Sequence, residues 1–367
     1  MKRYLLLPIV LLSVQSRAQQ HQLIVGTYTN NGKSEGIYVY DFDAKTGEVK
    51  QKSVAKGVEN PSYLTLSPDN KFVYSVNEAS ANSAASAFSF NAPAGELKFL
   101  NKQAVGADPC YLIADKKNII TANYSGGSAT VIGVNPDGSL GAVKQEVQHT
   151  GKSINAQRQN SSHVHMALFT PDHKFVLIND LGTDQIYIYS YHPESATQVL
   201  TLHKTVALTP GSGPRHLTFS DNGKFAYLLQ ELDAGVTVFS YKDGSLNKIQ
   251  ETKLTDKGFA GENGAADIHI SPDGKFLYAS NRGSENNITI FSIARNGLIS
   301  KTAQVSTLGK GPRNFVIDPS GKFLLVGHHQ SNNVVIFGLD KKTGIPKDTG
   351  KRIEVGEPVC LIFTPIP

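Results

Sequence analysis

Two histidines, His163 and His165, lie two positions apart just before an apolar run in the segment SSHVHMALF. In a strand, this spacing places both imidazole rings on the same face. Such a pair binds a metal ion when further ligands complete the site, and Asp180 or Glu231 could supply them. The same pair could instead belong to a general acid–base site. The choice depends on the side chains that the fold brings to the same place.

Arginine, glutamate and further histidine residues stand at the borders of other short apolar runs. They are Arg215 and His216 in GPRH, Glu231 in QEL, Asn281 and Arg282 in SNRG, Arg313 in GPRN, His329 in GHH and Asp180 in ND. Arginine side chains bind carboxylates and phosphates through paired hydrogen bonds, and glutamate or histidine transfers protons. Gathered at one site, these residue types would suit a small anionic substrate beside a general acid or base.

The elements that must position these residues are set by a repeated phrase. It consists of a Gly/Pro start, a short apolar strand, a turn of the Ser-Pro-Asp-Gly kind and a second apolar strand. Seven copies start 46 to 55 residues apart, at Pro61, Pro109, Val164, Pro214, Ala265, Pro312 and Pro358. This period, with about four short strands in each unit, predicts an all-β fold, a seven-bladed β-propeller.

The seventh unit supplies only its first strand, and the missing three match segments near the N-terminus. Those segments are QLIVGTY, GIYVYDF and GEVKQKSV. We therefore expect N-terminal strands to join the C-terminal strand in one blade and to close the ring. Residues 19–367 are expected to form a single propeller domain.

In a propeller, the start of a blade's first strand and the end of its second strand meet at the same face. This rule gathers candidates from blades three to six at one end of the channel: His163, His165, Asp180, Arg215, His216, Glu231, Asp267, Asn281, Arg282, Arg313 and His329. Structural roles remain open for several of them. Asp180 or Asn281 could cap a turn, and Arg215 could form a structural ion pair with Glu231. Since neighbouring arginines disfavour a bound cation, we expect neither a metal ion nor a cofactor.

The most specific segments are RQNSSHVHMALFTPD, GPRHLTFSDNGKFAYLLQEL and ADIHISPDGKFLYASNRG. Through these, the sequence resembles the seven-bladed propeller lactonases, which include a bacterial 6-phosphogluconolactonase type and, more distantly, carboxymuconate-lactonizing enzymes. The resemblance covers essentially the whole chain after the leader. It implies catalytic roles for His165, Arg215, Glu231 and Arg282, and the hydrolysis of a small anionic sugar lactone by activated water.

The remaining candidates are expected to contact the substrate, an anionic lactone or sugar acid. They are His163, Asp180, His216, Asn281, Arg313 and His329. Whether Glu231 or His165 acts as the base stays open, as does phosphorylation of the substrate. A propeller that binds a ligand or partner without chemistry is the alternative, and a muconate-type lactonization would use the same arginines.

The N-terminus has the features of a secretory signal peptide. Lys2 and Arg3 precede a mostly apolar run, and Ser16-Arg17-Ala18 fits a cleavage pattern. Residues 1–18 are therefore expected to be a leader, and the protein to be periplasmic or secreted. No later run is long and apolar enough to cross a membrane.

Several other classes of function lack support in the sequence. Without the leader's three basic residues, 33 basic residues face 31 acidic ones, so no general positive field favours nucleic acid. The H-E-x-x-H and paired C-x-x-C patterns are absent.

The two cysteines, Cys110 and Cys360, fall in blades two and seven with blade one between them. They also differ by one place in the repeat register. Their Cα atoms should therefore lie beyond the roughly 7 Å that a disulfide spans. We predict two free, mostly buried thiols.

Overall fold

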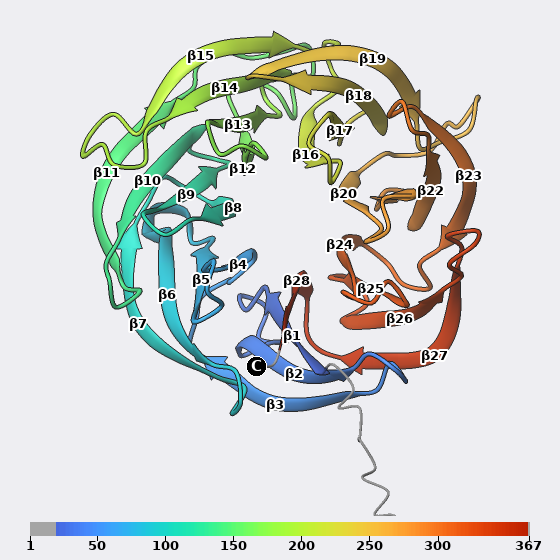
Figure 1. Cartoon of the computed structure of the whole chain (residues 1–367), viewed down its shortest axis with the longest axis horizontal. Helices are drawn as coiled ribbons and strands as arrows, with labels where there is room; N and C mark the ends of the chain where they lie inside the picture. Colours follow the sequence, from blue (N-terminus) through green and yellow to red (C-terminus); the bar gives the residue numbers. More distant parts are fainter. Residues whose placement is uncertain (1–19, 366–367) are drawn as a thin grey trace, which may run out of the picture.

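Seven four-stranded antiparallel sheets stand as blades around a central channel, as Figure 1 shows. The structure is a computed structural model that describes residues 20–365. The arrangement confirms the predicted all-β, seven-bladed propeller. The predicted leader, residues 1–18, lies outside the described residues. Within residues 20–365, no helix combines the length and apolar character that a bilayer span requires.

Each blade places its first strand at the channel and its second strand next outward. From blade one to blade seven the first strands are β4 (Leu64–Leu66), β8 (Pro109–Ala114), β12 (Val164–Phe169), β16 (Pro214–Phe219), β20 (Ala265–Ile270), β24 (Pro312–Ile317) and β28 (Pro358–Pro365). The second strands are β5 (Phe72–Asn77), β9 (Asn118–Asn123), β13 (Phe175–Asp180), β17 (Phe225–Gln230), β21 (Phe276–Asn281), β25 (Phe323–His328) and β1 (Gln20–Thr27).

The third and fourth strands complete each blade toward the rim. The third strands are β6 (Ala84–Asn91), β10 (Ser128–Val134), β14 (Gln185–Tyr191), β18 (Gly235–Lys242), β22 (Asn287–Ile293), β26 (Asn333–Leu339) and β2 (Gly36–Asp43). The fourth are β7 (Glu96–Ala104), β11 (Leu140–Gln148), β15 (Leu200–Ala207), β19 (Ser245–Lys253), β23 (Ile299–Ser306), β27 (Pro346–Glu354) and β3 (Val49–Lys56). A short 3₁₀ helix, η1 (Ser80–Asn82), follows β5.

The ring closes as expected, through pairing of β28 with β1 in blade seven. Seven residue pairs join these strands, from His21 opposite Pro365 to Thr27 opposite Pro358. The order of strands in this blade is β28-β1-β2-β3. Closure removes the free edge that an open ring would present.

The turn between the first two strands explains the repeated Ser-Pro-Asp-Gly phrase. In blade five, Ser271 Oγ donates to Asp273 Oδ1 at 2.7 Å and accepts from the Phe276 amide at 3.0 Å. The fourth position of this turn, Gly274, has a φ of 70°, which favours glycine. Local side-chain bonds of this kind satisfy the backbone where two strands reverse.

Neighbouring blades are held together by a second repeated contact. The phenylalanine that begins a second strand packs onto a glycine in the outer turn of the next blade. A Cβ on Gly297 would lie 2.3 Å from Phe225, and one on Gly344 would lie 2.7 Å from Phe276. Because burial of a phenylalanine contributes about 1.5–3 kcal/mol, repetition of this contact stabilises the ring and holds the channel at a fixed width.

The channel strands contain an irregularity that bears on function. In blades two, three, four and six, the second residue of the first strand is left unpaired between two regular pairs. Blade five skips two residues at the same place. A bulge redirects the extra side chain and bends the strand. The residues left out are Cys110, His165, Arg215, Ala266 with Asp267, and Arg313.

Candidate active site

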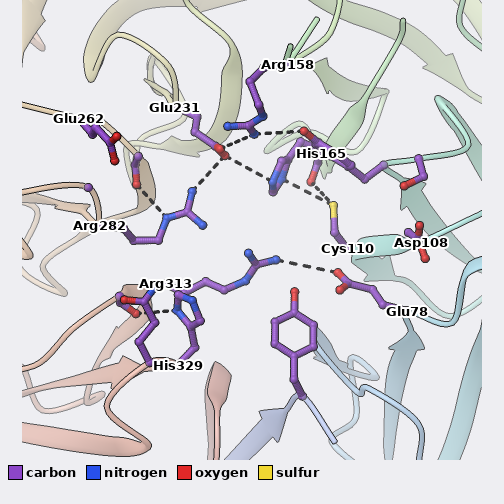
Figure 2. Close-up of a pocket in the computed structure, with 17 residues that line it drawn as sticks. Glu78, Asp108, Cys110, Arg158, His165, Glu231, Glu262, Arg282, Arg313 and His329 are labelled. Carbon is purple, nitrogen blue, oxygen red and sulfur yellow. Dashed lines mark hydrogen bonds and ion pairs between the residues drawn. The ribbon is translucent and has the colours of Figure 1, made fainter. Parts of the chain in front are cut away.

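A polar cavity of about 840 Å³ opens at one end of the channel, and all seven blades contribute to it (Figure 2). A second cavity of about 810 Å³ shares five of its residues and extends toward Lys33 and Glu357. The first cavity is lined by Tyr28, Glu78, Asp108, Cys110, Tyr124, Ser125, Arg158, His165, Glu231, Glu262, Gly264, Arg282, Gly283, Gly311, Arg313, His329 and Gln330.

One set of cavity residues comes from the bulges of the channel strands. Cys110, His165 and Arg313 each occupy a bulge and line the cavity. Arg215 occupies the equivalent bulge but is only 2% exposed and lies behind the cavity wall. The bulge therefore directs side chains of blades two, three, four and six toward the same end of the channel.

The other set directly follows the second strand of each blade. These residues are Tyr28, Glu78, Tyr124, Leu181, Glu231, Arg282 and His329, and all except Leu181 line the cavity. The strand's own last residue is buried in every blade and does not line it. In blade five, for example, Asn281 Oδ1 accepts a bond from the Gly264 amide at 2.9 Å. The last residue of the second strand therefore stabilises the turn, and the residue that follows it faces the cavity.

Three arginines converge on the carboxylate of Glu231, which is 5% exposed. Arg158 Nη2 lies 2.7 Å from Oε1, while Arg215 Nε and Arg282 Nη2 lie 2.9 and 3.2 Å from Oε2. Burial alone would raise the pKa of Glu231, but Arg282, Arg215, His165 and Arg158 together hold it well below the usual range. Glu231 is therefore ionised at neutral pH and holds the three guanidinium groups by its charge.

His165 sits beside this cluster as an uncharged imidazole. Its Nε2 lies 3.9 Å from Glu231 Oε2, and its Nδ1 lies 3.7 Å from the sulfur of Cys110. Burial, reinforced by the charge of Arg215, holds the pKa of His165 well below its usual value. A neutral imidazole at a cavity wall has a lone pair that can accept a proton.

A buried chain of polar groups fixes Arg215 from behind. Its Nη1 donates to the Ala266 carbonyl and lies 3.2 Å from His216 Nε2. His216 Nδ1 is 2.8 Å from Asp267 Oδ1, and Asp267 Oδ2 accepts a bond from Asn314 at 2.6 Å. Burial first, and then Arg215, lower the pKa of His216 to about 4. These buried hydrogen bonds restrict the movement of the Arg215 side chain. Arg215 can therefore hold Glu231 in position from behind the cavity wall.

A second carboxylate–arginine pair lies across the cavity, as Figure 2 shows. Arg313 Nη2 is 3.9 Å from Glu78 Oε1, and the Arg313 guanidinium carbon lies 5.4 Å from the centre of the Tyr28 ring. Within residues 20–365, the guanidinium of Arg313 makes no hydrogen bond. Burial raises the pKa of Glu78, with Arg313 opposing. The donors of Arg313 are therefore available to a ligand.

Five of the predicted residues meet at the cavity, and Arg215 supports them from behind. The five are His165, Glu231, Arg282, Arg313 and His329. His163, Asp180, His216, Asp267 and Asn281, which were expected at the same place, do not line the cavity. His216 and Asn281 are buried and bonded as described above, one beneath the cavity and one in a turn.

His163 and Asp180 do not reach the cavity, because β12 begins only after His163 and has a bulge at His165. The strand begins at Val164 and bulges at His165, so the two histidines do not share a strand face. The His163 ring stacks on Tyr124 with centroids 4.5 Å apart. Asp180 accepts bonds from the His163 amide at 2.8 Å and from His149 Nδ1 at 3.1 Å. It caps a turn, the structural alternative considered for it.

The sequence patterns did not single out Arg158, Tyr124, Glu78 or Tyr28. Arg158 lies in the inserted segment 151–162, where nothing distinguishes it from its polar neighbours before folding. Glu78, Tyr124 and Tyr28 occupy the same repeat position as Glu231 and Arg282. Extending the predicted site from blades three to six around the whole ring would have included them.

The remaining chemical groups give no sign of a metal centre or a reactive thiol. Among residues 20–365, no group of three or more His, Cys, Asp or Glu side chains is arranged to hold a metal ion. Both cysteines are free and buried, which confirms that prediction. Burial raises the pKa of the Cys110 thiol, and burial raises that of Cys360 to about 12. Both are thiols, not thiolates, at neutral pH.

Comparisons with known proteins point in one direction. A family model described as lactonase, 7-bladed beta-propeller, matches residues 22–363. The chain is 35% identical to the 6-phosphogluconolactonase of Bacillus subtilis over 345 residues, 92% of this chain and 97% of that protein. It is 38% identical to the 6-phosphogluconolactonase of Formosa agariphila over 331 residues, 88% of this chain and 93% of that protein. The structure of a periplasmic gluconolactonase from Pseudomonas aeruginosa superposes with a TM-score of 0.90 at 36% identity, covering 95% of this chain and all of that one.

Proposed function

This chain belongs to the seven-bladed β-propeller lactonases, and we infer from this membership and from its cavity that it is an enzyme that hydrolyses a small anionic sugar lactone. The observation that carries the assignment of the site is the Glu231 cluster. There, one buried carboxylate orients three guanidinium groups beside a neutral histidine at the cavity wall.

The arginines of the cluster retain donors for the substrate. Arg282 uses Nε on the Gly264 carbonyl and Nη2 on Glu231, and its Nη1 has no partner among residues 20–365. Arg158 uses Nη2 on both Tyr124 and Glu231, and its Nε and Nη1 have no partner in the same described part of the chain. Fixed donors of this kind stabilise the negative charge that develops on a carbonyl oxygen under attack. Glu231 and Arg215 hold them in place before substrate arrives.

The proton of the attacking water goes to His165 in this mechanism. His165 is uncharged and lines the cavity, so its imidazole can accept a proton at neutral pH. Glu231 is the weaker acceptor, because its protonation would leave three arginines without their counter-charge. The geometry therefore favours His165 among the two bases that the sequence suggested.

We propose a periplasmic or secreted location, supported by the leader-like residues 1–18 and by the relative described as a periplasmic gluconolactonase. The relatives described as 6-phosphogluconolactonases act on a phosphorylated lactone by name. A panel of substrates should therefore contain both phosphorylated and unphosphorylated sugar lactones.

The test is a lactone panel assayed near neutral pH and corrected for spontaneous hydrolysis. We expect His165→Ala to lower kcat/KM about 10²-fold or more on the best substrate. His192→Ala, at an exposed position of an outer turn, is the matched control and should keep full activity. A His165→Ala variant with near-full activity would refute the assignment of the base. If the wild-type protein gave no rate above background with any lactone, a binding propeller would be favoured instead.

A further inference from the structure

Opening a lactone requires two proton transfers, one from water and one to the ring oxygen that leaves. We propose that Glu78 is a catalytic residue that donates the second proton, acting as general acid across the cavity from His165 and Glu231 (Figure 2). The inference rests on the proposed lactone hydrolysis and adds a residue that lies outside the site predicted from blades three to six and outside the Glu231 cluster.

Four carboxyl groups line the cavity among the described residues, and their surroundings separate them. Glu231 is bonded by guanidinium groups, Asp108 Oδ1 accepts the Ser80 amide at 2.8 Å, and Glu262 is exposed to solvent. The Glu78 side chain is 15% exposed, and its nearest cation, Arg313, is 3.9 Å away. That distance exceeds a hydrogen bond. Glu78 thus differs from Glu231 in having no bonded guanidinium, from Asp108 in accepting no backbone amide, and from Glu262 in being enclosed.

The electrostatic surroundings of Glu78 favour its protonated form more than those of Glu231. Burial raises the pKa of Glu78, whereas the arginines hold the pKa of Glu231 well below its usual range. Two carboxyl groups of one site whose pKa values are driven apart commonly divide acid and base roles. Here His165 takes the base role, since Glu231 is committed to its arginines.

Groups on three neighbouring segments face Glu78 and contribute to this balance. They are Arg313 in β24, Tyr28 after β1, and Asp108 with Cys110 at the start of β8. Burial raises the pKa of both Tyr28 and Cys110, so these two stay neutral. Burial is the largest influence on the pKa of Glu78 and raises it. The charge of Arg313 and the hydroxyls of Tyr28 and Ser62 lower this pKa, the charge of Asp108 raises it, and the pKa is raised overall.

The step balances without any further reactant. The water oxygen bonds to the carbonyl carbon while its proton passes to Nε2 of His165. The bond from that carbon to the ring oxygen then breaks, and the electron pair stays on the ring oxygen, which takes the proton of Glu78. The product is a hydroxy acid. Protonated His165 and ionised Glu78 return to their starting states by exchanging protons with solvent.

The decisive measurement is the dependence of kcat/KM on pH with glucono-δ-lactone, from about pH 4.5 to about pH 8 and corrected for background. A required acid makes wild-type activity fall as pH rises through the pKa of Glu78, which lies above the ordinary 4.5. Glu78→Gln should lose about 10²-fold at the acidic end and lose this fall with pH. Glu78→Asp should retain the fall at a lower rate.

Glu96→Gln, which neutralises an exposed carboxyl on the outer strand β7 and away from the cavity lining, is the matched control and should keep the wild-type profile. A Glu78→Gln variant that is folded and keeps either near-full activity or the wild-type fall with pH overturns the proposal. So does a wild-type profile that only rises with pH across the same range. A wild-type protein without lactonase activity would instead overturn the proposed function, so the two failures are distinguishable.

The leaving group offers a second readout that a merely structural role would not move. A phenolate leaves an aryl lactone such as dihydrocoumarin without much help, whereas a sugar alkoxide needs a proton. Loss of a general acid should therefore cost at least about tenfold less on the aryl lactone than on glucono-δ-lactone. Equal losses of kcat/KM on the two substrates would count against Glu78 as the acid.

Discussion

The Glu231 cluster and the Glu78–Arg313 pair are built from the same two residue types on opposite sides of one cavity. In the first, a carboxylate is bonded by Arg158, Arg215 and Arg282. In the second, the carboxylate and Arg313 are 3.9 Å apart, and the guanidinium makes no hydrogen bond within residues 20–365. The comparison shows that the hydrogen bonds of a charged side chain, and not its residue type, decide whether it is held in place or can interact with a ligand. A carboxylate bonded by three guanidinium groups holds those groups in place, while one without a bonded guanidinium can still exchange a proton.

The largest expected contrast is in stability. Glu231→Gln should lower the free energy of unfolding by about 3–5 kcal/mol, because it leaves buried arginine charge uncompensated. Glu78→Gln should change it by less than about 1 kcal/mol, since only a long, partly exposed ion pair is lost. Because the chain contains no tryptophan, urea unfolding of the two variants should be followed by circular dichroism, which gives both free energies of unfolding. Equal destabilisation by the two substitutions would break the distinction drawn here.

The arginines should divide in the same way, with smaller effects. Arg215→Met removes the buried bonds to Glu231 and to the Ala266 carbonyl, so it should destabilise the fold by about 2–3 kcal/mol. Arg313→Met should leave stability nearly unchanged but lower kcat/KM about tenfold or more, because its donors serve the substrate. Urea unfolding and steady-state kinetics on both variants provide the comparison. An Arg313 variant that is as active as wild type would contradict it.

The smallest effect is an opposite response of the two carboxyl groups to pH. The folded-state pKa of Glu231 is lowered, so its stabilising contribution is present above the ordinary value of about 4.5 and is lost as pH falls through the folded value. The folded-state pKa of Glu78 is raised, so its contribution is present at low pH and is lost as pH rises through the folded value.

Stability measured against pH for wild type, Glu231→Gln and Glu78→Gln tests these signs. On acidification below about pH 4.5 the advantage of wild type over Glu231→Gln should shrink. The difference between wild type and Glu78→Gln should move the other way, by less than about 1 kcal/mol. Parallel curves for the two comparisons would show that the surroundings of the two carboxyl groups are not distinct.

The sequence was sufficient for the fold, because the pattern of two apolar strands around a turn occurs six times and its first strand a seventh time. It also indicated the functional end of the channel. At some positions, however, the residue predicted to face the cavity is one place before the residue that does so. Asn281 ends its strand and fixes a turn, while the next residue, Arg282, lines the cavity; Asp180 likewise ends its strand and fixes a turn, but Leu181 after it is buried.

The β-bulges of the channel strands could not be predicted from the alternation of apolar and polar residues either. Strict alternation along β12 would place His163 and His165 together, but the strand starts between them and bulges at the second. A bulge costs pairing locally and is set by how neighbouring blades pack, which alternation alone does not encode. Arg158 presents a similar difficulty, since a loop residue finds Glu231 only after both are folded.

Because β1 pairs with β28, the ring can close only after the last strand of the chain has been synthesised. Tyr28 leaves the ribosome early, but β28 begins only at residue 358. At about 5–20 residues per second, the ring therefore waits on the order of tens of seconds for its closing strand. Until then β1 has one unpaired edge, which invites aggregation. A chain interrupted before residue 358 lacks β28, so β1, which leads to Tyr28 at the cavity, would have no partner strand on the channel side.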